Sequence, residues 1–102
     1  MIGFGAYAID WLRSQRFDEP TRRAVYEWLS RLIIPHLGQT TLVALTPTQL
    51  RTWDLEMRRR NLTPRIRQKL RIHVQAILNS AVAEGRIPEN PATFAEDHGP
   101  DR

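Results

Sequence analysis

Apolar residues recur along this chain at intervals of three and four residues, a spacing that places them on one face of an α-helix. The first such segment runs from about Phe4 to Gln15. A second helix is expected after Asp18, a suitable N-cap. It should stop before Pro35, because a residue preceding proline is disfavoured in the helical region. The residues that these two helices are expected to bury are Phe4, Tyr7, Ala8, Trp11, Leu12, Val25, Trp28, Leu29 and Leu32.

The third predicted helix has the clearest start in the sequence. Thr46 and Gln49 have the spacing of a capping box, in which each side chain bonds the backbone amide of the other residue. The helix should continue to about Arg59, and the preceding residues 36–45 are predicted to be irregular. The residues expected to face the core in this helix and in the irregular segment are Leu50, Trp53, Met57, Leu37, Leu42 and Leu45.

The fourth helix is predicted from Pro64 to about Gly85. Thr63 can accept a hydrogen bond from a first-turn amide, and Pro64 has the backbone angle that a first turn needs. Gly85 can take the left-handed conformation that ends a helix. The apolar stripe of this helix consists of Ile66, Leu70, Val74, Ile77 and Ala81. Its other side carries Arg65, Gln68, Lys69 and Gln75.

Four helices with short connections, and no convincing strand, predict an all-α four-helix bundle around a single core. The chain has 102 residues, which suits one small domain. We expect this domain to span residues 1–91, and we interpret the acidic segment 92–102, which has no helical periodicity, as a flexible tail or linker. No apolar run approaches the roughly 20 residues that cross a bilayer, and no signal peptide is recognisable, so an intracellular protein is expected.

Candidates for catalysis and metal binding do not form a site in the sequence. The chain has no cysteine, and His36, His73 and His98 lie in unrelated places without the spacing of a metal site. Asp54 and Glu56 are two residues apart on a helix, so they point to different faces and do not suggest paired carboxylate catalysis. We expect no metal, no other cofactor and no enzyme active site.

Positive charge is concentrated in one region of the chain. The net charge is +4, but residues 51–75 contain eight Arg or Lys residues against Asp54 and Glu56, an excess of six positive charges. Two interpretations stay open: a surface that binds a polyanion such as nucleic acid, and a surface that only keeps the protein in solution. The three consecutive arginines 58–60 also have a structural explanation, because cations are favoured at a helix C-terminus.

Arg65 and Lys69 are better candidates for anion binding. They are four residues apart at the start of a helix, where like charges repel each other and the helix dipole disfavours cations. A bound anion would offset this cost. Gln68 lies between them, and its amide can bond an adenine edge or a phosphate, so the same surface can combine attraction with base readout.

Several short motifs resemble one known family. They are Phe4-Gly5-Ala6-Tyr7-Ala8, Trp11-Leu12, Pro20-Thr21-Arg22-Arg23, Ile34-Pro35-His36-Leu37-Gly38, Leu45-Thr46-Pro47, Leu62-Thr63-Pro64, Ala81-Val82 and Ile87-Pro88-Glu89-Asn90-Pro91. In this order and spacing they resemble the N-terminal core-binding domain of phage integrases of the tyrosine recombinase family. The resemblance covers nearly the whole chain. It implies a SAM-like four-helix bundle that grips double-stranded DNA at the core site of recombination.

The resemblance also implies which residues contact DNA. In that family the second and fourth helices of the domain face the duplex. The matching residues here are Thr21, Arg22, Arg23, Tyr26, Thr63, Arg65, Gln68, Lys69 and Gln75. Residue types and spacing alone indicate the group on the fourth helix, but they give no special status to Thr21 or Tyr26.

In such integrases a C-terminal catalytic domain cleaves the strand, and it would begin after Asn90-Pro91. Its arginines, histidines and nucleophilic tyrosine are therefore not expected in this chain, and neither Tyr7 nor Tyr26 is a candidate for that nucleophile. We expect the chain to bind DNA without cleaving it, in the cytoplasm of a bacterium, together with its catalytic domain and other recombinase protomers. The alternative is a helical module that binds an acidic protein partner.

Overall fold

This computed structural model describes residues 2–92 and 94. These residues contain four long α-helices and one short one. The long helices are α1 (Phe4–Ser14), α2 (Glu19–Trp28), α4 (Pro47–Arg59) and α5 (Pro64–Ala83), and the short one is α3 (Ile34–Leu37). Within these residues only an isolated antiparallel bridge between Gly3 and Thr41 has β character. The predicted all-α four-helix bundle is confirmed.

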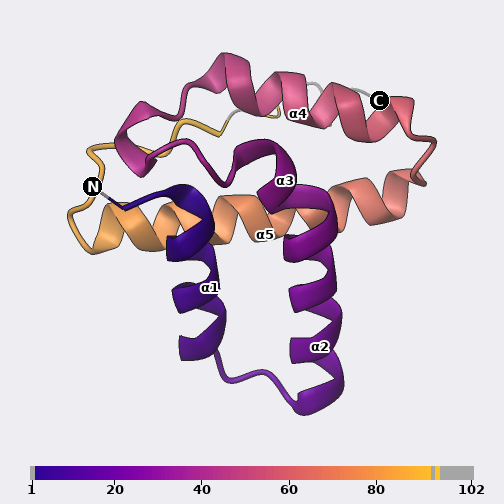
Figure 1. Ribbon diagram of the computed structural model, residues 1–102, viewed down its shortest axis with the longest axis horizontal. Helices are drawn as coiled ribbons and strands as arrows, with labels where there is room; N and C mark the ends of the chain where they lie inside the picture. The colour runs from indigo at the N-terminus through magenta and orange to yellow at the C-terminus, as the bar shows by residue number, and fades with distance from the viewer. Residues whose placement is uncertain (1, 93, 95–102) are drawn as a thin grey trace.

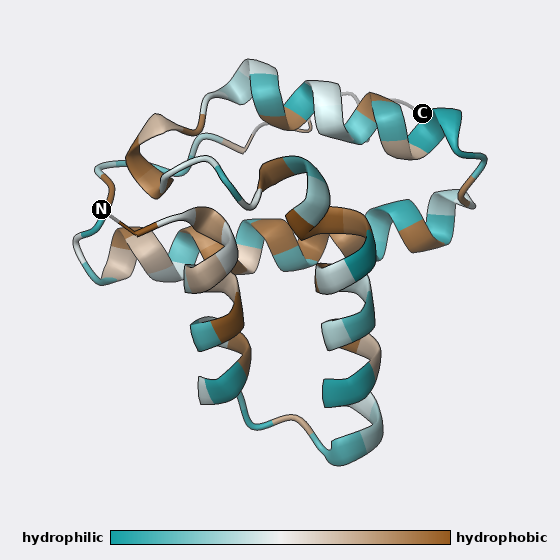
Figure 2. Cartoon of the chain, viewed as in Figure 1, coloured by the Kyte–Doolittle hydropathy of each residue, from teal (hydrophilic) through white to brown (hydrophobic). Residues whose placement is uncertain are grey.

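The helices form two parts that meet at the core (Figure 1). α4 and α5 lie across the molecule and are joined by a tight turn, and α5 passes behind α1 and α2. α1 and α2 run side by side as a hairpin that projects away from α4. α5 contacts both α1 and α4. Apolar residues gather where the hairpin meets α3 and α5, whereas the free end of the hairpin is largely hydrophilic (Figure 2).

The buried face of α5 lies at the centre of the core. The residues of this helix with no accessible surface are Leu70, Val74, Ile77, Leu78 and Ala81. The predicted stripe is therefore confirmed, except that Ile66 is only partly buried and Leu78 joins the core. Because these residues cover little more than one side of the helix, the opposite side is left to solvent.

The predicted starts of α4 and α5 are confirmed in their hydrogen bonds. The Thr46 amide donates to Gln49 Oε1 over 3.0 Å, and the Gln49 amide donates to Thr46 Oγ1 over 3.2 Å. This reciprocal pair is the capping box. At the start of α5, Thr63 Oγ1 accepts from the Ile66 amide over 3.2 Å. Between the two helices the chain reverses at Asn61, whose φ of 62° is a left-handed conformation that asparagine tolerates.

The end of α5 also follows the prediction. Gly85 has a φ of 76°. Its amide donates to the Val82 carbonyl over 3.0 Å, and the Arg86 amide donates to the Ala81 carbonyl over 2.9 Å. These two bonds form a Schellman motif, which satisfies the last carbonyls of the helix and turns the chain back towards the core.

The prediction that the second helix stops before Pro35 is wrong. The chain stays helical after α2 through a π-helical turn, Leu29–Ile33, and then through α3, which contains Pro35. Ile34 has helical angles, φ −62° and ψ −38°, although it precedes proline. The wider π turn leaves room for the proline ring. The Leu32 carbonyl there accepts a hydrogen bond of 2.8 Å from Trp53 Nε1 of α4, so a tertiary contact supports a conformation that local preference disfavours.

The segment between α3 and α4 is tied to the start of the chain. The Gly5 amide donates to the Gly38 carbonyl over 3.0 Å. A Cβ atom on Gly38 would lie 2.6 Å from Ile34 Cγ2. Gly38 therefore packs this closely against Ile34 only because glycine has no side chain. The segment predicted as irregular contains the end of α3 and a 3-10 turn, Leu42–Ala44. The residues that hold it against the core are, as predicted, Leu37, Leu42 and Leu45.

The core extends beyond the predicted end of the domain. Phe94 is 6% exposed, and the centroid of its ring lies 6.1 Å from that of Trp53. The segment 92–102, interpreted as a tail, therefore has a buried anchor at Phe94. Residues 93 and 95–102, which include His98, lie outside the described residues. The domain boundary after residue 91 stays a prediction.

A buried ion pair joins α4 to α5. Arg71 Nη1 donates to Asp54 Oδ1 over 3.1 Å, and Asp54 is 8% exposed. Glu56 points to a different face of α4, as predicted, where it pairs with Arg59 and Arg60 at the surface. Each of these buried charges is compensated only by the other, so moving them apart would leave an unpaired charge in the core. The pair therefore fixes the position of α5 relative to α4.

Removing Asp54 should destabilise the fold. In Asp54→Ala the guanidinium of Arg71 loses a buried carboxylate, so we expect the free energy of unfolding to fall by about 3–5 kcal/mol. Urea denaturation followed by circular dichroism measures the change. Asp10→Ala, which removes an exposed ion pair with Arg13, is the matched control and should cost less than about 1 kcal/mol. Equal losses in the two variants would contradict the role of the buried pair.

Candidate nucleic-acid interface

Four side chains in the first half of α5 share one exposed side of this helix, opposite the core. They are Arg65, Gln68, Lys69 and Ile72, and we call them the α5 face. Arg65 and Lys69 are one helical turn apart, and so are Gln68 and Ile72, which places the Cβ atoms of each pair about 5–6 Å apart. Burial of Leu70 on the opposite side fixes the orientation of α5 about its own axis. All four side chains of the α5 face are therefore exposed to solvent.

Thr63 lies at the N-terminal edge of the α5 face. Its Oγ1 accepts the Ile66 amide, which leaves the hydroxyl hydrogen able to donate to an outside acceptor. The side chain is exposed. A phosphate oxygen at this point would meet both a hydroxyl donor and the positive end of the helix dipole.

The acidic residues near the α5 face are engaged elsewhere. Glu56 Oε1 lies 3.6 Å from Arg59 Nη1, and its Oε2 lies 3.4 Å from Arg60 Nε. Asp54, the other acidic residue of this region, is buried in its ion pair with Arg71. In the part of the chain that the structure describes, no carboxylate pairs with Arg65 or Lys69. Positive charge is therefore partly neutralised on α4 and left unpaired on the α5 face.

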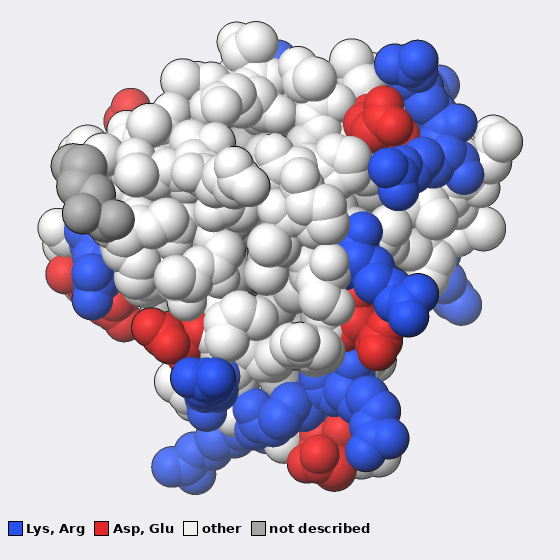
Figure 3. Space-filling view, in the orientation of Figure 1, with Lys and Arg blue, Asp and Glu red and all other residues white. Residues whose placement is uncertain are grey.

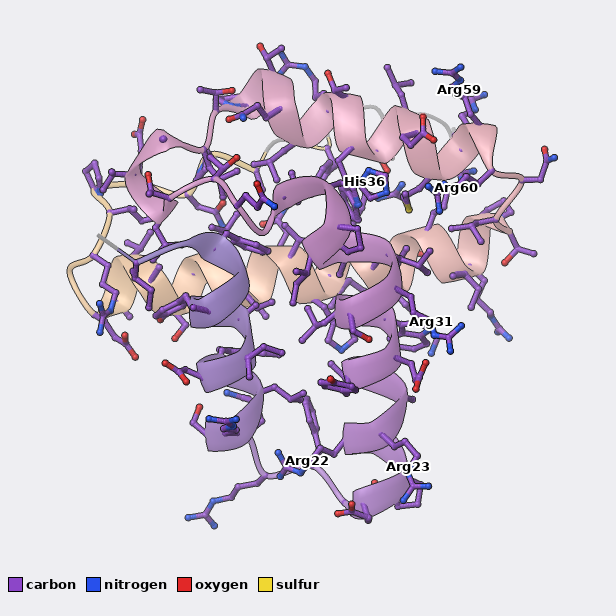
Figure 4. All side chains as sticks on the ribbon, in the orientation of Figure 1. Arg22, Arg23, Arg31, His36, Arg59 and Arg60 are labelled. Atoms are coloured by element: carbon purple, nitrogen blue, oxygen red, sulfur yellow. The ribbon has the colours of Figure 1, made fainter. Side chains whose placement is uncertain are left out.

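Basic side chains border the side of the molecule drawn in Figure 3 and leave its centre uncharged. They gather near the end of α4 and around the free end of the α1–α2 hairpin. Figure 4 identifies Arg59 and Arg60 at the first place and Arg22 and Arg23 at the second, with Arg31 between them. Basic side chains thus extend from the hairpin to the turn between α4 and α5, with acidic side chains beside them. Arg31, for example, pairs with Glu27 over 2.6 Å.

One side of α2 faces α5. The centroid of the Trp28 ring lies 5.5 Å from that of the His73 ring on α5. Thr21 is exposed and lies seven residues before Trp28, which is two turns along the same stripe of the helix. The structure therefore places Thr21 on the side of the hairpin that faces α5. His73 also contacts Trp11, with ring centroids 6.3 Å apart, so this histidine packs at the edge of the core.

Arg23 and Tyr26 lie on a different side of α2. Together with Ile9 and Leu12 of α1 they line a groove of about 310 Å³ between the two helices. Tyr26 is 49% exposed there. The structure does not bring these two residues together with the α5 face, and their contact with DNA stays a prediction.

Arg22 is engaged within the hairpin. Its Nη1 donates to the Leu12 carbonyl over 2.6 Å, and its Nη2 donates to the Gln15 carbonyl over 2.7 Å. The guanidinium thus caps the carbonyl end of α1, where a cation is favoured. These bonds cross the turn between α1 and α2, so helical spacing does not reveal them. A phosphate contact by Arg22, which stays a prediction, would compete with them.

Gln75 lies two turns beyond Gln68, near the segment that follows α5. It is half-buried, and its backbone carbonyl accepts a hydrogen bond of 3.4 Å from Asn90 Nδ2. The same Nδ2 donates to Asn79 Oδ1 over 2.8 Å. Asn90 therefore fastens the following segment to α5 beside Gln75. The predicted DNA contact of Gln75 is untested.

The described ranges contain no candidate metal site, no membrane-spanning helix and no buried polar side-chain atom without a hydrogen bond. No group of three or more His, Asp or Glu side chains is placed to hold a metal ion. Among the helices of residues 2–92, none is long and apolar enough to cross a bilayer. Every buried side-chain nitrogen or oxygen in these ranges has a hydrogen-bond partner.

This arrangement of helices is that of an integrase-like domain. The solution NMR structure of the integrase-like domain from Bacillus cereus matches it with a TM-score of 0.87, over 92% of this chain and 81% of that chain. The two sequences are 23% identical, so the likeness concerns the fold.

The sequence defines the family more closely. The family described as the phage integrase central domain matches residues 4–98, and the chain belongs to this family. The integrase of Mycobacterium phage L5 is 29% identical over 96 residues, which cover 94% of this chain and 25% of that relative. This chain thus spans about a quarter of the length of the curated relative. The resemblance to phage integrases seen in the sequence motifs is confirmed.

Acid should weaken the start of α2. Hydrogen bonds from the Thr21 hydroxyl and amide to the Asp18 carboxylate hold the pKa of Asp18 below its usual value of 3.8. Because the folded state has the lower pKa, this contribution to stability is complete above the usual pKa and is lost as the pH falls through the folded-state pKa. Below about pH 4 the free energy of unfolding should therefore fall more steeply in the wild type than in Asp18→Ala. Urea denaturation at a series of pH values compares the two, and parallel profiles would contradict the capping role.

Proposed function

We propose that this domain binds double-stranded DNA at the core site of a site-specific tyrosine recombinase. The proposal rests above all on the exposed pair Arg65 and Lys69. Both cations stand near the positive end of α5, one turn apart, without a carboxylate partner in the described residues. Each of these features is unfavourable in the free protein, at up to about 1 kcal/mol each. Two phosphates of a DNA backbone would turn them into attractions.

In the proposed complex the first half of α5 enters the major groove. Arg65 and Lys69 contact neighbouring phosphates along one edge of the groove, and the Gln68 amide beside them reaches base edges, where a carboxamide can bond adenine through two atoms. The Thr63 hydroxyl donates to a phosphate at the helix start. Thr21, on the side of the hairpin that faces α5, contacts the DNA backbone further along the duplex, where its hydroxyl exchanges the hydrogen bond to Asp18 for one to a phosphate.

Strand cleavage in this proposal belongs to a separate catalytic domain of the full-length recombinase. Membership of a family described as a central domain supports this division, and so does the larger size of the phage L5 integrase, of which this chain covers 25%. Other protomers would occupy the neighbouring part of the recombination site. Such a protein acts in the cytoplasm of a bacterium, where phage and chromosomal DNA meet.

Binding should depend steeply on salt. If Arg65, Lys69 and one further cation each neutralise a phosphate, the logarithm of the association constant should fall against the logarithm of the salt concentration with a slope of about −3. Fluorescence anisotropy with a short labelled duplex, between about 50 and 200 mM salt, measures this slope. Affinity that does not change with salt would contradict the proposal. A failure to bind at low salt would contradict it as well and would favour the alternative, a module for an acidic protein partner.

Removing one cation of the α5 face should weaken binding more than removing a basic residue elsewhere. We expect Arg65→Ala and Lys69→Ala each to lower the affinity by about tenfold, the size of one charged hydrogen bond, and to reduce the salt slope by about 1. The matched control is Arg86→Ala, because Arg86 pairs with Glu84 at the opposite end of α5. Circular dichroism confirms that each variant is folded. Equal effects in all three variants would remove the special role of the α5 face.

A further inference from the structure

Ile72 is an apolar side chain on an otherwise polar surface. It is 55% exposed, and it is absent from the residues that pack against the core. Single exposed apolar residues are common on proteins and need no explanation by themselves. The position of Ile72 is what matters, because it lies four residues after Gln68 and three after Lys69, on the same exposed side of α5.

Neither local structure nor stability accounts for isoleucine at this position. A β-branched residue is a weaker helix former than alanine, leucine or lysine, so it does not favour the helix here. Its neighbours on the buried side, Leu70 and Val74, are fully covered without it. Contact with a partner molecule is therefore the simplest explanation for an isoleucine at this position.

The chemistry of the α5 face indicates what that partner offers. Arg65 and Lys69 match an anionic backbone, and Gln68 matches a base edge. An aliphatic group placed one turn further along the same helix would lie over the edges of neighbouring base pairs in the major groove. Among the groups that DNA presents there, the C5-methyl group of thymine is the apolar one.

We propose that Ile72 is a specificity-determining residue that recognises the methyl group of a thymine in the core site. This inference rests on the proposed function, because it assumes that the α5 face enters the major groove. Ile72 excludes water from the methyl group and gains contact area only when that group is present. A cytosine at the same place lacks the C5-methyl group and presents a polar amino group in place of O4, so it offers isoleucine no apolar contact.

The test combines a protein variant with a DNA variant. Wild-type chain first selects duplexes from a randomised pool, and the recovered sequences show at which positions thymine is preferred. Each preferred thymine is then replaced by deoxyuridine, which lacks only the methyl group. We expect one replacement to lower the affinity of the wild type by about three- to fivefold, the size of one buried methyl group, and to leave the affinity of Ile72→Ala unchanged. Ile72→Ala should also lose the thymine preference at that position.

Leu55→Ala is the matched control, because Leu55 is 57% exposed on α4, outside the α5 face. This variant should keep the thymine preference and the sensitivity to deoxyuridine. Both alanine variants should stay folded, since each replaces an exposed residue by a better helix former.

The outcomes separate this inference from the function on which it rests. If the wild type binds no duplex at low salt, the proposed function fails, and this inference fails with it. If the wild type binds but deoxyuridine affects Ile72→Ala as strongly as the wild type, only this inference is overturned. It is also overturned if Ile72→Ala keeps its DNA affinity and thymine preference but changes self-association in sedimentation, because Ile72 would then serve a protein contact.

Discussion

Leu70, Val74 and Ile77 of α5 have no accessible surface, and their burial fixes the rotation of this helix about its own axis. Burying a side chain of this size stabilises the fold by about 1.5–3 kcal/mol. Repulsion between like charges one turn apart, and a cation near a helix start, each cost less than about 1 kcal/mol. The core therefore decides the orientation, and the opposite side of the helix presents Arg65 and Lys69 to solvent although they repel each other.

The α1–α2 hairpin depends on the same helix. Trp11 and Trp28, one from each arm, both contact His73 of α5, so the hairpin is fixed to α5 at a point next to the α5 face. At its free end the guanidinium of Arg22 bonds the last carbonyls of α1 and holds the turn. The hairpin and α5 are thus held at a defined angle. A rigid angle between two surfaces is what a domain needs if both are to contact the same duplex.

The candidate site was predictable where its residues depend on one helix alone. Arg65, Gln68 and Lys69 share a side of α5 because of helical periodicity, and the structure leaves them exposed together. Arg22 and Gln75 differ, because their surroundings come from other segments: Arg22 bonds carbonyls of α1 across a turn, and Gln75 lies beside Asn90. The exposed position of Ile72 follows from the same periodicity, but an apolar residue on a polar side is easily taken for part of the core pattern.

The sequence by itself determined the helix starts at Thr46 and Thr63, the Schellman end at Gly85 and the buried stripe of α5, because each depends on residues within about one or two turns of each other. Only the tertiary structure decided that the chain stays helical through Pro35, where the Trp53 indole reaches the Leu32 carbonyl across the core. It also decided the buried pair of Asp54 and Arg71 and the anchor at Phe94. These contacts join residues far apart in the sequence, and their energies depend on burial that no local pattern specifies.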